Sequence, residues 1–287
     1  MTKIIVPATS ANLGVGFDSV GVAVNLYLTV EILDANNRWE ILHELGDGIP
    51  TDESNLIIAT ALKIAPKITS HRLKMTSEIP LEHGLGSSSS AIVAGILLAD
   101  KLGNLQLTMA EKLQIACELE GHPDNVVPAL MGGLAVASYD GKLVYQQLSV
   151  PDCALIATIP DYSVSTAKAR EVLPQEFPRS AAVTASSRAN VMVAALANGD
   201  LTNAGQMMER DLFHENYRTT LVPELAKVRT AAHEFGAYAT YLSGAGSTTM
   251  TWINPKNAAA VLSALTAFGE VRQLEIDKKG ARIIDGE

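Results

Sequence analysis

The chain has 287 residues, of which 47% are hydrophobic and 18% are charged, so it has enough apolar material for a substantial core. Its formal net charge of −9 and its lack of any basic run argue against nucleic-acid or anionic-membrane partners, because these attract clustered Lys and Arg. No stretch reaches the roughly 18 apolar residues of a membrane helix. Two cysteines, Cys117 and Cys153, lack metal-ligand spacing, and a reducing, cytoplasmic setting is expected.

The first half of the chain predicts a strand-rich region with three helices. β-Branched and aromatic residues between turn-forming stretches indicate strands, and apolar runs behind helix-starting residues indicate helices. Strands are expected at 3–7, 27–33, 38–44 and 72–80, helices at 54–65, 88–102 and 108–120, and a hairpin at 134–139 and 142–148. Thr and Glu at 108 and 111 are spaced as in a capping box, and Asp-Gly at 140–141 is a hairpin turn signal.

The second half of the chain has a different pattern, in which one strand is followed by three helices. We expect a strand at 153–160, helices at 180–198, 200–210 and 222–235, strands at 237–243 and 248–253, a helix from 254 and a closing strand at 270–276. A proline near the start of the third helix and a glycine just past its end have the usual asymmetry. Together the two halves predict an α+β protein with two lobes, residues 1–150 and residues 151–287.

The most informative segment runs from Pro80 to Ala91 and reads Pro-Leu-Glu-His-Gly-Leu-Gly-Ser-Ser-Ser-Ser-Ala. It leaves a predicted strand and passes through two glycines and four hydroxyls into a predicted helix. Because glycines allow a tight turn and a helix start offers N–H groups and partial positive charge, the segment indicates a phosphate site. It has neither the P-loop lysine nor a Gly-x-Ser-x-Gly motif. The alternative is a plain loop before a serine-capped helix.

This segment resembles the ATP loop of the GHMP kinases, a superfamily of small-molecule kinases. The resemblance implies that the triphosphate of ATP is wrapped by Pro80, Leu81, Glu82, His83, Gly84, Leu85, Gly86, Ser87, Ser88, Ser89 and Ser90. By the same resemblance Ser88 lies near Mg²⁺. The loop is specific for the superfamily but does not identify the substrate.

A second motif at residues 7–18, Pro-Ala-Thr-Ser-Ala-Asn-Leu-Gly-Val-Gly-Phe-Asp, is similar nearly residue for residue to the first motif of the homoserine kinases. It fails the dinucleotide fingerprint, because its third glycine falls at Gly21. On its own it would be interpreted as a tight connecting loop in which Asn12 and Asp18 cap turns. A third motif at 242–249 resembles the superfamily's glycine loop beside the nucleotide, but it departs from the usual pattern at Ala245 and Ser247, to which we assign no role.

Residues 118–128, residues 165–174 and Arg218 also match the homoserine kinases. The resemblance implies that Asn12, Glu118 and Arg218 are catalytic, that Ser88 and Glu118 bind Mg²⁺, and that the substrate is bound by Asn12, Asp18, His122, Asn125, Thr166, Arg170, Arg218 and Gly244. For His122 two roles stay open, a hydrogen bond to the substrate or one to the backbone after Gly121. The implied fold has an N-terminal lobe like domain 2 of ribosomal protein S5 and a ferredoxin-like C-terminal lobe.

The implied reaction is the ATP-dependent phosphorylation of the L-homoserine hydroxyl to O-phospho-L-homoserine, a step of threonine biosynthesis. The substrate carboxylate suits the planar donors of Arg170 and Arg218. Its ammonium suits the oxygens of Asp18 and of two asparagines, 12 and 125. Asp18 and Asp124 are both possible bases by type, but we assign no general base and expect direct in-line transfer by positioning and electrostatics.

Two other functions stay open at this point. Another GHMP kinase, acting on mevalonate, a sugar or shikimate, would share the glycine–serine loop, but the paired arginines and the first motif argue against uncharged substrates. A nucleotide-binding regulator would keep the fold without catalysis. A homodimer is plausible from the apolar composition and from family habit.

Overall fold

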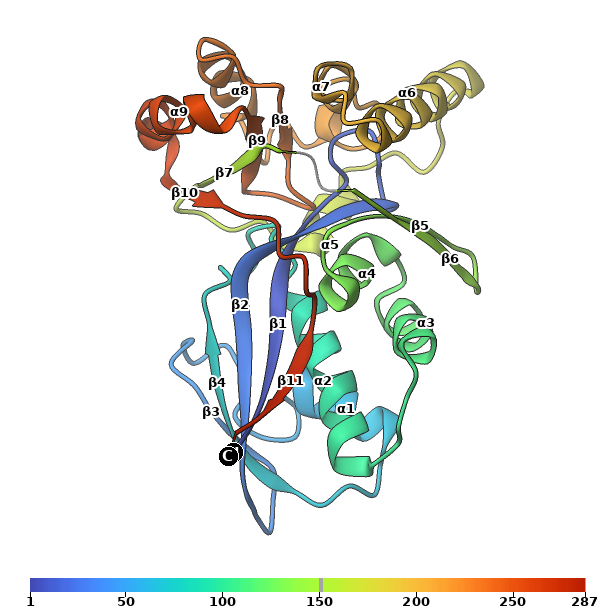
Figure 1. Cartoon of the computed structure of the whole chain (residues 1–287), viewed down its shortest axis with the longest axis vertical. Helices are drawn as coiled ribbons and strands as arrows, with labels where there is room; N and C mark the ends of the chain where they lie inside the picture. The colour runs from blue at the N-terminus through green and yellow to red at the C-terminus, as the bar shows by residue number, and fades with distance from the viewer. Residues whose placement is uncertain (150–151, 287) are drawn as a thin grey trace.

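The chain folds around two separate β-sheets, one in each of two lobes stacked along its long axis (Figure 1). The computed structural model describes residues 1–149 and 152–286, so the lobe boundary expected between residues 150 and 151 lies outside the described residues. The predicted two-lobed α+β fold is confirmed. Within the described residues, no helix combines the length and the apolar character needed to cross a membrane.

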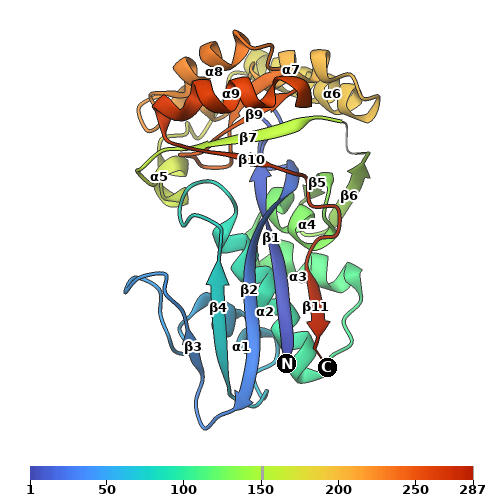
Figure 2. The same cartoon turned by 60° about the vertical axis from the view of Figure 1, so that its left-hand side comes forward.

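The sheet of the first lobe is mostly antiparallel and is covered on one face by helices (Figure 2). Its strands are β1 (Thr2–Ala11), β2 (Val20–Ala35), β3 (Glu40–Leu42), β4 (His71–Ser77), β5 (Leu134–Tyr139), β6 (Leu143–Leu148) and β11 (Arg282–Asp285). They follow the order β11-β1-β2-β4-β3, with β5 paired to β2 and β6 to β5, and only β3 and β4 run parallel. The covering helices are α1 (Leu56–Ile64), α2 (Ser87–Gly103), α3 (Met109–Glu120) and α4 (Pro123–Met131).

The sheet of the second lobe has the order β10-β7-β9-β8 with antiparallel neighbours, as in ferredoxin-like folds. Its strands are β7 (Ala154–Ile159), β8 (Ala239–Leu242), β9 (Thr249–Ile253) and β10 (Glu270–Leu274). Helices α6 (Arg179–Ala197), α7 (Leu201–Met208), α8 (Leu225–His233) and α9 (Ala258–Leu265) lie over its outer face, and α5 (Thr166–Glu171) lies on the side of the first lobe (Figure 2). Short 3₁₀ turns are η1 (Glu215–Tyr217), η2 (Pro255–Asn257) and η3 (Thr266–Phe268). Since β7 and β9 are buried throughout, both faces of this sheet are covered.

The structure corrects the predicted elements at several points. The strand expected at 270–276 does not close the chain, because β11 returns to the first lobe and pairs with β1, which brings the two termini together (Figure 2). Helix α4 was not predicted, since Pro123 and Pro128 lie within it; Pro123 is tolerated because it occupies the first turn. The capping box at Thr108 and Glu111 is confirmed.

Candidate active site

The glycine–serine loop connects β4 to α2 and ends at Gly86, the N-cap of the helix. Gly84 and Gly86 have φ angles of 74° and 71°. A Cβ atom at Gly84 would lie 2.1 Å from the carbonyl oxygen of Ser243, and one at Gly86 would lie 2.2 Å from Thr9 Oγ1. Both positions therefore require glycine. No side chain in the described part of the chain caps this helix end, which leaves its first N–H groups open to a phosphate.

Two cavities meet at this loop. An apolar cavity of about 450 Å³ beside β2, β4, α1 and α2 is lined by Leu28, Ile49, Ile57, Met75, Ile79 and Ala91, among others. A polar pocket of about 360 Å³ lies between the lobes. The two share Glu82, Ser87 and Ser88 as lining residues. The loop therefore lies between the apolar cavity and the polar pocket and lines both.

The polar pocket collects most of the predicted site residues. It is lined by Asn12, Asp18, Glu82, Gly84, Gly86, Ser87, Ser88, Ser89, His122, Asn125, Thr166, Arg170, Arg218 and Gly244. The other loop residues lie elsewhere: Leu81 lines the apolar cavity, and Pro80 and His83 line a separate groove. Leu85 and Ser90 are buried in the protein, where they support the loop.

The third motif packs directly on the glycine–serine loop. Ser243 Oγ donates to the carbonyl oxygen of Gly84 at 2.7 Å, and the Thr248 N–H donates to that of His83 at 3.1 Å. Ser247, at one of the two departures from the usual motif, donates from Oγ to the carbonyl oxygen of Tyr162 at 2.6 Å. The third motif thus holds the glycine–serine loop in place from the second lobe.

The first motif forms a strained loop between β1 and β2. Asn12, Leu13 and Asp18 have φ angles of 72°, 45° and 52°, which are costly for residues with a Cβ and occur mainly at functional sites. The Asn12 amide holds this loop: Oδ1 accepts from the Asp18 N–H at 3.0 Å, and Nδ2 donates to the carbonyl oxygen of Gly244 at 3.1 Å. Asn12 therefore lines the pocket with both ends of its amide engaged.

Asp18 and Arg170 form a two-pronged ion pair at the pocket. Arg170 Nη2 donates to Asp18 Oδ1 at 2.8 Å, and Nη1 donates to Oδ2 at 3.2 Å. Burial by itself disfavours the charged guanidinium, but the bonds and charge of Asp18 outweigh it and raise the pKa of Arg170. The Phe17 ring lies 5.9 Å from the Arg170 guanidinium carbon. The two groups predicted for opposite ends of an amino acid are thus bonded directly to each other at the pocket wall.

Arg218 is held far more tightly than Arg170. It is 3% exposed, and its Nε donates to the carbonyl oxygen of Ala169 at 3.0 Å. Its Nη1 donates to the carbonyl oxygen of Gly244 at 2.9 Å and to His214 Nδ1 at 3.2 Å. Burial, followed by the charge of Arg170, lowers the pKa of Arg218 to about 10, so the group stays cationic near neutral pH.

His122 is part of a series of hydrogen-bonded side chains at the pocket. Its Nδ1 lies 2.6 Å from Asp124 Oδ1, which also accepts from Asn125 Nδ2 at 3.1 Å, and Thr9 Oγ1 donates to Asn125 Oδ1 at 2.8 Å. Burial by itself lowers the pKa of His122, but the bond to Asp124 and the nearby carboxylates outweigh it and raise that pKa. The ring is therefore bonded to a carboxylate, whereas the sequence left open a bond to substrate or backbone.

The structure does not bring Glu118 together with the other predicted site residues. Its exposed carboxylate accepts from Gln114 Nε2 at 2.9 Å, whereas Glu120 lines the pocket and accepts from Ser89 Oγ at 2.5 Å. Residues two apart on a helix point about 200° apart around its axis, so only one of these glutamates can face Ser88. Glu118, the expected Mg²⁺ ligand, is thus not among the residues that line the pocket, and Glu120 is the glutamate of α3 that lines it.

Comparisons with known proteins show which family the chain belongs to. The family models "GHMP kinases N terminal domain" and "GHMP kinases C terminal" match residues 55–133 and 192–271. The chain is 52% identical to a homoserine kinase of Lactococcus lactis subsp. lactis over 290 residues, which covers 98% of both chains. It is 53% identical to that of Streptococcus equi subsp. equi over 286 residues, covering 98% of this chain and 100% of the relative. This chain belongs to the homoserine kinase family of GHMP kinases. A solved structure from Listeria monocytogenes, described provisionally as a homoserine kinase, is 45% identical with a TM-score of 0.91 over 100% of both chains.

Two residues next to the predicted site residues of this GHMP kinase, Glu120 and His214, were not singled out from the sequence. A signal for Glu120 was available, because it continues the spacing of the buried residues Leu113 and Ala116 along α3, whereas Glu118 breaks it. His214 gave no signal of this kind. It lies four residues before Arg218 on an irregular turn, and only the tertiary structure places its ring against the first motif.

Proposed function

We propose that this chain transfers the γ-phosphoryl group of ATP to the hydroxyl of L-homoserine and forms O-phospho-L-homoserine, a step of threonine biosynthesis. The observation that carries the proposal is the polar pocket that the open start of α2 shares with the Asp18 carboxylate and with the guanidinium groups of Arg170 and Arg218. A zwitterionic alcohol matches this set, because its ammonium suits Asp18 and its carboxylate suits Arg170 and Arg218. Full-length similarity to homoserine kinases supports the same substrate.

ATP is proposed to span both cavities. The apolar cavity suits a flat aromatic base, and the shared residues of the glycine–serine loop suit the triphosphate. Ser88, Ser89 and Glu120 offer hydroxyl and carboxylate oxygens, the hard donors that Mg²⁺ prefers, and the Ser89–Glu120 bond gathers two of them. When bound, Mg²⁺ would neutralise negative charge on the triphosphate.

The residues of the pocket are proposed to act by positioning and electrostatics. The two carboxylates considered as general bases are both engaged in other bonds. Asp18 is paired with Arg170, and Asp124 is bonded to His122 and Asn125. The substrate hydroxyl oxygen would bond to the γ-phosphorus while the bond from phosphorus to the β,γ-bridging oxygen breaks. The hydroxyl proton would pass to the transferred phosphoryl group. This leaves the protein to hold the two reactants in line.

The first experiment is a coupled ADP-release assay with MgATP and homoserine, mevalonate, galactose, shikimate or threonine. Turnover confined to homoserine is expected. Turnover on another alcohol would keep the nucleotide site but refute the roles of Asp18, Arg170 and Arg218. Binding of ATP without any turnover would favour a nucleotide-binding regulator.

A cytoplasmic homodimer is also proposed. The two thiols are free, as suits a reducing compartment in which disulfides are rare. The dimer rests on family habit. Light scattering at several protein concentrations would test it, and a mass that stays at 30.4 kDa would refute it.

A further inference from the structure

His214 is a buried imidazole that contacts two parts of the proposed amino-acid site, the first-motif loop and Arg218. Its Nε2 lies 2.9 Å from the carbonyl oxygen of Gly14, in the first motif, and its Nδ1 lies 3.2 Å from Nη1 of Arg218. The ring also stacks on Phe17, with centroids 5.1 Å apart and planes 20° from parallel. The same ring therefore contacts the loop that carries Asp18 and the arginine proposed for the substrate carboxylate.

The neighbours of His214 fix its protonation. A carbonyl oxygen only accepts, so Nε2 must carry the hydrogen that is donated to Gly14. A guanidinium only donates, so Nδ1 must be the bare nitrogen that accepts from Arg218. The arrangement requires a neutral imidazole with its proton on Nε2, and this tautomer makes both bonds at once.

We propose that His214 is a positioning residue that sets the orientation of Arg218 toward the substrate carboxylate, an inference that rests on the proposed homoserine site. Ala169, Gly244 and His214 together accept from Nε and from both N–H bonds of Nη1. The donors that remain for a carboxylate are those of Nη2. Three acceptors from three segments hold the guanidinium plane, and loss of the His214 bond would leave one N–H of Nη1 without a partner and weaken the hold on that plane.

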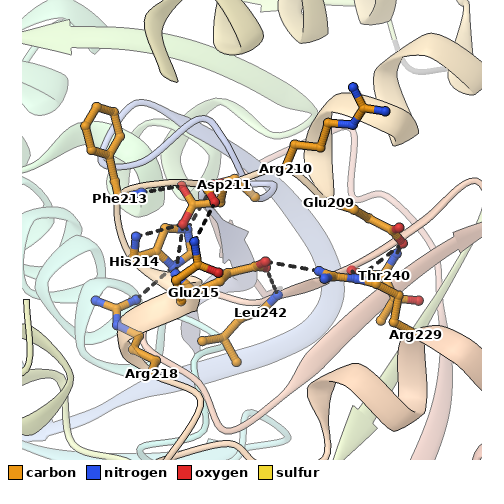
Figure 3. Close-up of polar contacts among 12 residues, drawn as sticks. Glu209, Arg210, Asp211, Phe213, His214, Glu215, Arg218, Arg229, Thr240 and Leu242 are labelled. Carbon is orange, nitrogen blue, oxygen red and sulfur yellow. Dashed lines mark hydrogen bonds and ion pairs between the residues drawn. The ribbon is translucent and has the colours of Figure 1, made fainter. Parts of the chain in front are cut away.

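The backbone of His214 is itself held from behind, which makes the ring a rigid support (Figure 3). The Asp211 carboxylate accepts from the N–H groups of residues 213–215 at 3.0, 2.7 and 2.8 Å. The buried Glu215 carboxylate accepts from the Leu242 N–H at 2.8 Å and from Arg229 Nη2 at 3.0 Å. These bonds tie the turn to β8 and α8, so the ring cannot follow a displaced arginine.

Two substitutions separate positioning from simple space filling. His214→Gln can keep a donor for Gly14 but offers no acceptor where Nδ1 stands. His214→Asn keeps an acceptor near Arg218 and loses the donor to Gly14. The measurements are the KM for homoserine, the KM for ATP, kcat and the melting temperature of each full-length variant beside the wild type.

We expect His214→Gln to raise the homoserine KM about tenfold, as for loss of one hydrogen bond to a charged group, with the ATP KM within about twofold of wild type. His214→Asn should retain most of the homoserine affinity. An unchanged homoserine KM in His214→Gln, or equal losses in both variants that follow the melting temperature, would overturn the proposal. Failure of the wild type to phosphorylate homoserine would instead refute the proposed function, so the two failures are distinguishable.

Discussion

The two ends of the pocket are built in different ways. The phosphate end is one continuous segment, the loop before α2 and the first turn of that helix, and it offers mainly backbone N–H groups. The amino-acid end takes its groups from segments far apart in the sequence, among them Asp18, His122, Arg170, Arg218 and Gly244. Here the chemistry lies mostly in polar and charged side chains, each held by bonds to other segments.

This difference determines how each end responds to substitution. Backbone N–H groups survive a change of side chain, provided that glycines allow the backbone to reach its position. Paired side chains depend on each partner, because a group left without its partner keeps the cost of its burial. Substitutions at the phosphate end should therefore affect ATP, and those at the amino-acid end should affect homoserine.

The largest effect is expected at Glu120, where the two ends meet. Glu120→Gln removes the charge that we propose for Mg²⁺ and should lower kcat by about 10²–10³, as for loss of one preorganised electrostatic contact. Glu118→Gln is the matched control on the opposite side of α3 and should stay within about twofold of wild type. Steady-state kinetics with varied Mg²⁺ would measure both. A normal kcat in Glu120→Gln, or a large loss of kcat in Glu118→Gln, would contradict this proposal and favour Glu118 as the Mg²⁺ ligand.

The next effect tests the phosphate end alone. Gly84→Ala introduces a Cβ at a φ of 74° and 2.1 Å from the carbonyl oxygen of Ser243. The left-handed conformation and the overlap together should lower kcat/KM for ATP about a hundredfold. The exposed Gly46→Ala is a control, because its added Cβ meets no atom within 4 Å although its φ is also positive. A normal ATP KM in Gly84→Ala would show that the loop adjusts freely.

The loop and helix of the proposed phosphate end were predictable from the sequence, because contiguous residues form them. Two glycines before a helix start indicated a phosphate site by physical argument alone, and the structure confirms the loop and the helix. The amino-acid end was not derivable in this way. Asp18 and Arg170 are 152 residues apart, so only the resemblance to a family brought them together in advance.

The structure differs from the sequence-based expectations at three points, and each has its own cause. Glu118 was assigned from its place in a motif, without asking which face of α3 it occupies. Strand β11 was missed because it is short and half exposed and is held by pairing with β1, at the other end of the chain. Helix α4 was hidden by its prolines. Of the three, only β11 depends on a tertiary contact, its pairing with β1; the other two depend on local helix geometry.

At the amino-acid end, the two arginines should differ in their tolerance of lysine. Arg218→Lys cannot reach Ala169, Gly244 and His214 at once and should raise the homoserine KM about thirtyfold, in line with the cost of disrupting a buried charged group. Arg170→Lys keeps a single contact to Asp18 in a pair whose side chains are 40% and 34% exposed and should cost less. Equal effects in the two variants would contradict the difference in burial.

The smallest effect is expected for Asp18→Asn, which replaces the carboxylate proposed for the substrate ammonium by an amide of the same shape. The homoserine KM should rise about tenfold, because a hydrogen bond to a charged group is weakened. The melting temperature should hardly change, since the ion pair with Arg170 is partly exposed and such pairs contribute at most about 1 kcal/mol. Homoserine and ATP titrations beside a thermal scan would measure all three quantities. A rise in the ATP KM as large as that for homoserine would mean that the two ends of the pocket are coupled, and the division drawn between them would fail.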